Sequence, residues 1–195
     1  MSNQNTKDVR LYDSETGKPL TDGRINGFED VRGIALYEKS DILFVAAKKD
    51  GLYMMDRGTG QTRASQGENL MNDRYDPQGL LYKPTSVLIK DDILYIGNQA
   101  RKHEGGGNIL YMDLSKGEDA RIENFIDNTD DPSFESPSGL AFGPDGKFYV
   151  NSREGMQTIS YDVVVNVNGT RSAQNAEVFT EHKDQPLGLL WVPIQ

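Results

Sequence analysis

One short phrase recurs along the chain: a turn of small residues, an apolar stretch, a tight polar turn and a second apolar stretch. The clearest copy runs from Pro137 to Val150, and two others begin at Val31 and Pro84. A fourth copy begins at Pro186. The copies follow one another at a spacing of about 50 residues, a period typical of folds that repeat one small sheet. This repeat limits the fold more strongly than any other feature of the sequence.

The repeat predicts an all-β fold, a β-propeller of about four blade equivalents. Third strands are expected at 52–56, 109–113 and 158–162, and weaker fourth strands at 61–64, 121–125 and 177–179. Four antiparallel strands in each unit is the pattern of a propeller blade. Because blades bury their faces only against neighbouring blades, residues 1–195 are expected to form a single domain, either a propeller or a half-propeller.

The two ends of the chain are expected to share one incomplete blade. Residues 9–13 and 24–28 match a third and an outer strand, and residues 187–193 match an inner strand. Latching them together closes the ring but leaves this blade without a second strand. Three explanations stay open: a three-stranded blade, a strand donated by another chain in a homodimer, or a piece of a longer propeller. Two half-rings of eight blades in total satisfy closed symmetry as well as one ring of four blades.

Composition and charge narrow the function classes. The chain has 195 residues, no cysteine and a formal net charge of −9. The missing cysteines exclude disulfides, thiolate catalysis and cysteine-based zinc sites. The acidic balance argues against a nucleic-acid partner, and no apolar run has the length of a membrane span. The polar residues after Met1 contain no signal-peptide core, so the protein is expected to be cytoplasmic if Met1 is native, and otherwise exported with its signal removed.

The third repeat, SPSGLAFGPDGKFYV at residues 136–150, resembles an NHL repeat and is equally similar to repeats of the SMP-30 (gluconolactonase, regucalcin) superfamily. The resemblance covers roughly residues 31–180 and rests on strand and turn positions, including the hairpin turn at Pro144-Asp145-Gly146. It implies a β-propeller. For gluconolactonase-like members it also implies a divalent metal in the central channel and hydrolysis of a lactone.

The same resemblance implies where channel ligands would lie, just before the anchoring residue of each inner strand. Those positions hold Arg32, Thr85, Ser138 and Leu187. None has the carboxylate or amide oxygen that a hard cation requires, and Arg32 would repel it. We therefore expect no metal in the channel and no cofactor.

Loops that are expected to converge at one end of the channel carry basic residues, and the loops around them carry acidic residues. The candidate ligand-binding residues are Arg32, Thr85, Asn98, Arg101, His103, Ser138 and Arg153. Arginine and histidine side chains suit a small anionic ligand or a carboxylate on a protein partner. The alternative is a set of solvated loop charges.

Two further candidates concern catalysis and calcium. His103, beside Glu104, is the one candidate for an acid or base near the channel mouth; the alternative is an exposed loop histidine. Asp127, Asp130 and Asp131 offer enough oxygen for calcium. They lack the spacing of an EF-hand, and turns use aspartate freely.

Three functions follow from these patterns. The first is a ligand- or protein-binding propeller without chemistry of its own. The second is a lactone hydrolase of the SMP-30 type or a propeller lyase acting at the channel mouth. The third is an assembly protein that forms a larger ring by self-association. The fold does not choose among them, because propellers host many functions.

Overall fold

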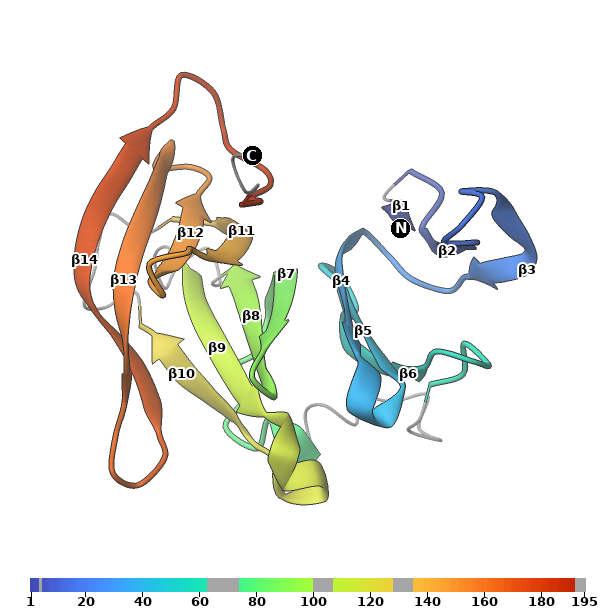
Figure 1. The fold of residues 1–195 in the computed structure, drawn as a ribbon, viewed down its shortest axis with the longest axis horizontal. Coiled ribbons are helices and arrows are strands. Elements are labelled where there is room, and N and C mark those ends of the chain that lie inside the picture. The colour runs from blue at the N-terminus through green and yellow to red at the C-terminus, as the bar shows by residue number, and fades with distance from the viewer. Residues whose placement is uncertain (4, 63–73, 100–106, 128–134, 192–195) are drawn as a thin grey trace.

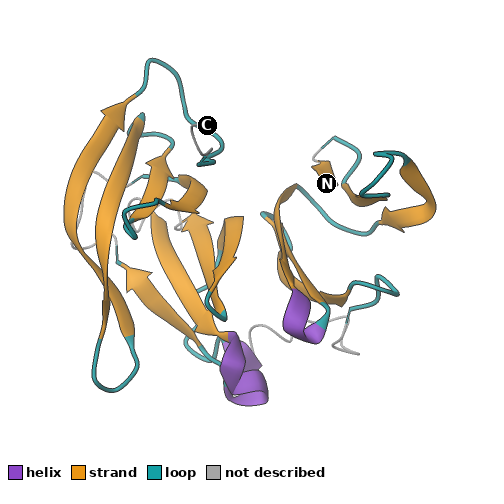
Figure 2. Ribbon diagram, viewed as in Figure 1, coloured by secondary structure: helices purple, strands orange, loops and turns teal. Residues whose placement is uncertain are grey.

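The computed structural model describes residues 1–3, 5–62, 74–99, 107–127 and 135–191. The described residues fold into four antiparallel sheets that follow one another along an arc (Figure 1). Helix is confined to short turns, including η1 (Glu38–Ser40) and η3 (Leu114–Asp119), drawn in purple in Figure 2. The prediction of an all-β propeller fold with four blades is confirmed.

The first two sheets have three named strands each. The N-terminal sheet has the order β1 (Ser2–Asn3), β2 (Asp8–Tyr12) and β3 (Pro19–Ile25). The second has the order β4 (Val31–Tyr37), β5 (Ile42–Ala47) and β6 (Gly51–Asp56). A single bridge from Met55 to Thr62 begins the predicted fourth strand of this blade. The part of that strand beyond residue 62 lies outside the described residues.

The third and fourth sheets have four strands each. The third contains β7 (Lys83–Lys90), β8 (Ile93–Gln99), β9 (Gly107–Asp113) and β10 (Ile122–Ile126). The fourth contains β11 (Pro137–Phe142), β12 (Phe148–Ser152), β13 (Gln157–Val165) and β14 (Arg171–Glu181). Every pairing joins strands that are adjacent in the chain, as expected for a blade.

Tight turns between the first and second strands set the register of each blade. Asp41, Asp92 and Gly146 occupy these turns with φ angles of 56°, 63° and 80°. Aspartate tolerates this left-handed region better than most residues, and glycine adopts it freely. The aspartate and glycine residues of the repeat thus allow the backbone conformation that the tight turns require.

The apolar core lies between neighbouring sheets, in three clusters. Val9 and Val45 belong to the cluster between the first and second sheets. Phe44 and Leu94 belong to the next cluster, between the second and third sheets. In the last cluster the ring centroid of Tyr95 lies 5.1–5.3 Å from those of Phe125, Phe142 and Phe148. Each blade is therefore held by its neighbours, as the repeat predicts.

The chain ends differ from the prediction in two respects. The N-terminal sheet does have a strand in the second position, because Ser2–Asn3 pairs with β2; its sequence shows no apolar pattern. Residues 186–191 lie against β11 but belong to no sheet. Within the described residues the expected latch with the N-terminal strands is not formed, since the four blades make an open arc whose ends lie apart (Figure 1). None of the helices in the described ranges is long and apolar enough to cross a membrane.

Candidate functional site at the axial mouth

The inner strands β4, β7 and β11 belong to three successive blades, and all three begin at the same end of the central axis. Arg32, Thr85 and Ser138 occupy matching positions near these starts, as predicted. The two hydroxyls are already used: Thr85 Oγ1 donates to the carbonyls of Gly97 and Pro137, and Ser138 Oγ donates to the carbonyl of Pro186 at 2.6 Å. Each hydroxyl therefore joins its inner strand by a hydrogen bond to the corresponding segment about 50 residues later, β7 to β11 and β11 to residues 186–191.

Arg32 differs from the two hydroxyl residues because it forms an ion pair. Its Nε lies 2.7 Å from Oδ1 of Asp30, and its second terminal nitrogen donates to Oδ2 of the same carboxylate. The pair is only partly exposed, with 26% of the Arg32 side chain accessible. Asp30 thus neutralises the positive charge of Arg32 at this end of the central axis.

Lys48 is the most unusual cation of the mouth. It lies in the turn between β5 and β6 and is half-buried. Burial lowers its pKa, the nearby charge of Arg32 lowers it further, and Arg153 and Lys83 act in the same direction, while Asp30 opposes them. Within the described part of the chain, no carboxylate forms an ion pair with its ammonium group.

The remaining two cations come from two other blades. Lys83 begins β7, and its Nζ lies 4.8 Å from the ring centroid of Tyr82. Arg153 follows β12, and its Nε donates to Oε1 of Gln185 at 2.9 Å. We call the set of Arg32, Lys48, Lys83 and Arg153 the axial cation cluster. It gathers positive charge from three blades of a protein whose net charge is −9.

Asn98 supports the start of β7, where Lys83 of this cluster lies. It is 2% exposed, and its Oδ1 accepts from the backbone nitrogens of Tyr82 and Lys83, each at 2.9 Å. Its Nδ2 donates to the carbonyl of Leu80 and to Oδ1 of Asn108. All of its hydrogen-bonding capacity is spent on the chain. The sequence marked Asn98 as a ligand candidate, but its geometry fits a support for the start of β7.

Several sequence candidates cannot be placed. Arg101, His103, Asp130 and Asp131 lie outside the described residues. Asp127 directly follows β10 at the outer rim of its blade. Among the described residues, no three histidine or acidic side chains are placed to hold a metal ion. The catalytic and calcium candidates therefore stay predictions.

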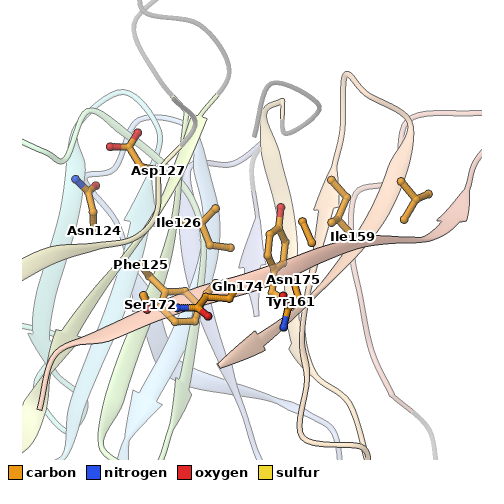
Figure 3. A pocket seen from close by; sticks show the side chains of 12 residues that line it. Asn124, Phe125, Ile126, Asp127, Ile159, Tyr161, Ser172, Gln174 and Asn175 are labelled. Atoms are coloured by element: carbon orange, nitrogen blue, oxygen red, sulfur yellow. The ribbon is translucent and has the colours of Figure 1, made fainter. Parts of the chain in front are cut away.

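A separate pocket of about 560 Å³ lies between the outer strands of the third and fourth blades (Figure 3). Its lining comes from the end of β10, from β13 and from β14. Phe125, Ile159 and Tyr161 form an apolar floor, whereas Gln174 and Asn175 are polar side chains of β14. No local pattern in the sequence indicates this pocket, because its lining comes from strands of two blades that are distant in the chain.

Comparisons with known proteins agree with the fold. No family model and no curated protein matches the chain. Hydrazine synthase of Kuenenia stuttgartiensis superposes with a TM-score of 0.60 and 13% identity, over 96% of this chain and 53% of that one. A luciferin-regenerating enzyme gives a TM-score of 0.60 and 14% identity, over 91% of this chain and 55% of that one.

The designed protein Ika8 superposes with a TM-score of 0.53 and 14% identity, over 96% of this chain and 48% of that one. This chain thus spans about half the length of these structures. At such identities the likeness concerns the fold alone. Together, the four sheets and these superpositions identify the chain as β-propeller-like.

Proposed function

We propose that this protein is a binding module whose axial cation cluster holds a small, multiply charged anion. The observation that carries the proposal is Lys48, a half-buried ammonium whose pKa is lowered by burial and then by the charges of Arg32, Arg153 and Lys83. Removing a charge from water is costly unless it is paired. A bound carboxylate or phosphate would relieve that cost and the repulsion among the cations together.

The cluster suits an anion in its geometry as well as its charge. Arg153 offers a planar guanidinium group that can bind two oxygens at once, and Lys48 and Lys83 act as point charges. Arg32, which Asp30 already binds through two nitrogens, can add only its remaining N–H groups. Asn98 fixes the backbone of Lys83, and the bond from Arg153 to Gln185 orients its guanidinium group, so two of the cations are partly positioned before the ligand arrives. Such preorganisation lowers the entropic cost of binding.

Catalysis has less support at this mouth. A hydrolase of the SMP-30 type needs oxygen ligands or an acid–base pair at the axis, and the matching positions hold Arg32, Thr85 and Ser138. The kinship with NHL and SMP-30 propellers is part of the proposal. It is supported by the β11–β12 hairpin, in which Gly146 donates its N–H to the carbonyl of Gly143 at 3.0 Å.

Calorimetric titration with citrate and with pyrophosphate tests the proposal. We expect binding of at least one of these anions, and at least about tenfold weaker binding in the Lys48→Ala and Arg153→Ala variants, equal to about 1.4 kcal/mol each. Lys116→Ala is the matched control, because Lys116 lies in η3 and is exposed.

Two results would count against the anion site. One is the absence of heat or thermal shift with either anion at low ionic strength, where surface attraction is strongest. The other is an equal loss of affinity in Lys116→Ala, which would mean that the anions respond only to overall charge.

A further inference from the structure

We infer that residues 186–191 complete the N-terminal sheet of a second copy of this chain, so that two arcs close into one ring. Two parts of the described structure are left unmatched, and they complement each other. One is the extended segment 186–191, which pairs with no described strand. The other is the N-terminal sheet, in which no described residue forms an inner strand.

Residues 186–191 are held as an inner strand is held elsewhere in the arc. Ser138 Oγ donates to the Pro186 carbonyl, just as Thr85 Oγ1 donates to the Pro137 carbonyl one blade earlier. Asn151 Nδ2 donates to the carbonyl of Gly188 at 2.9 Å. A Cβ added to Gly139 would lie only 2.9 Å from the Leu189 nitrogen, so the two backbones are in close contact.

The outward side of this segment is unused. Leu187 and Leu190 are 65% and 81% exposed, and the segment pairs with no strand among the described residues. An apolar strand with an unpaired edge is a ready template for another chain. The exposure of these two leucines therefore indicates that a further strand packs beside the segment.

The N-terminal sheet has the opposite deficiency. Ser2 in β1 pairs with Val9 of the third strand in its blade, and Asn151 in β12 pairs with Thr158 of the third strand in the fourth blade. Val9 and Thr158 are equivalent, because each lies four residues before the aspartate that follows or ends the repeat pattern, Asp13 and Asp162. By this register β1 occupies the place of β12, the second strand of its blade. In the fourth blade the far side of β12 carries the inner strand β11. On β1 the equivalent side carries no strand within the described ranges.

A second copy fits better than closure within one chain. The two unmatched parts lie apart in Figure 1. The arc also superposes on only 53% and 55% of the length of two propeller-like structures, at a TM-score of 0.60. Two arcs related by a two-fold axis would each give residues 186–191 and each receive them, which is a closed arrangement.

The inferred register can be tested with cysteines, because the chain has none. In the second blade the anchoring Gly33 pairs with Ala46 of β5, and transferring this pairing places Gly188 of one copy opposite Ser2 of the other. Cα atoms of such antiparallel pairs lie about 4.5–5.5 Å apart, which is within reach of a disulfide. A Cβ at Gly188 meets no atom within 4 Å, so Gly188→Cys is compatible with the fold.

The experiment mixes full-length Ser2→Cys and Gly188→Cys chains, one with a mass tag, refolds them together and oxidises them. We expect a disulfide-linked heterodimer as the main product, whereas Lys116→Cys mixed with Ser2→Cys gives only background. Native mass spectrometry of the unaltered chain should show twice the 21.7 kDa of one chain.

Three results would overturn the inference. These are a monomer of the unaltered chain at micromolar concentration, cross-linking no greater than in the Lys116→Cys control, and an internal disulfide within single chains of the Ser2→Cys/Gly188→Cys double variant. None of these measurements depends on anion binding. The inferred dimer can therefore fail while the proposed anion site stands, and the reverse.

Discussion

Tyr111 joins the third blade to the fourth, and its removal should weaken that junction. Its hydroxyl donates to Oε2 of Glu123 at 2.7 Å and accepts from the backbone nitrogen of Arg171, in β14, at 3.1 Å. The residue is 3% exposed. In Tyr111→Phe the hydrogen bond to a charged acceptor is lost and the Arg171 N–H loses its partner. We expect the free energy of unfolding at pH 7 to fall by about 2 kcal/mol.

The raised pKa of Tyr111 adds a separate prediction, on how stability depends on pH. Burial, helped by the hydrogen bond to Glu123, raises the pKa of this phenol to about 12 from 10.0. Between pH 10 and 12 the unfolded chain releases this proton while the folded chain retains it, so stability falls as the pH rises. The full contribution is present below pH 10 and amounts to about 3 kcal/mol for two pKa units.

Urea denaturation of the wild type and Tyr111→Phe from pH 7 to pH 12 measures both effects. The two stability curves should converge above pH 10, because only the wild type has this phenol to ionise. The remaining tyrosines titrate in both proteins and cancel in the difference. The exposed Tyr12→Phe is the control and should change stability by less than about 0.5 kcal/mol. Equal stabilities at pH 7, or a constant difference up to pH 12, would refute the reasoning.

Three shorter predictions follow from the inner strands and the mouth. Gly33→Ala should destabilise the fold by about 1–3 kcal/mol in urea, because its Cβ would lie 3.1 Å from the Ser86 backbone of the next blade; unchanged stability would mean that the blades are not so closely packed. Ser138→Ala should lower the free energy of unfolding in urea by about 1 kcal/mol, because the hydrogen bond to the Pro186 carbonyl is lost; unchanged stability would argue against this hydrogen bond. Anion affinity should be greatest while Lys48 is protonated and fall as the pH rises through its lowered pKa; in Lys48→Arg, calorimetry across that range should show no such fall.

Much of the fold could be predicted because its signals are local. Apolar runs bounded by polar turns mark β5 and β8, and the Asp and Gly turn residues fix where each hairpin folds back. β1 escaped prediction because Ser2 and Asn3 have no apolar pattern, and only pairing with β2 makes them a strand. Local signals therefore found those strands that bury their own side chains.

The repeat predicts the strand positions of Thr85 and Ser138, and whether they belong to a binding site stays a prediction. Their hydrogen-bond acceptors lie about 50 residues further along the chain. No local pattern reveals such a partner. The grouping of Lys48 with Arg153 is equally non-local, since it depends on the angle between blades.

The open arc has a mechanical consequence. Every apolar cluster joins one blade only to the next, and no described contact runs across the arc from its first sheet to its last. We expect small rotations at the successive junctions to add up, so that in a single arc the separation of the two ends varies more than the geometry within any one blade. Pairing with a second arc would remove this freedom at both ends.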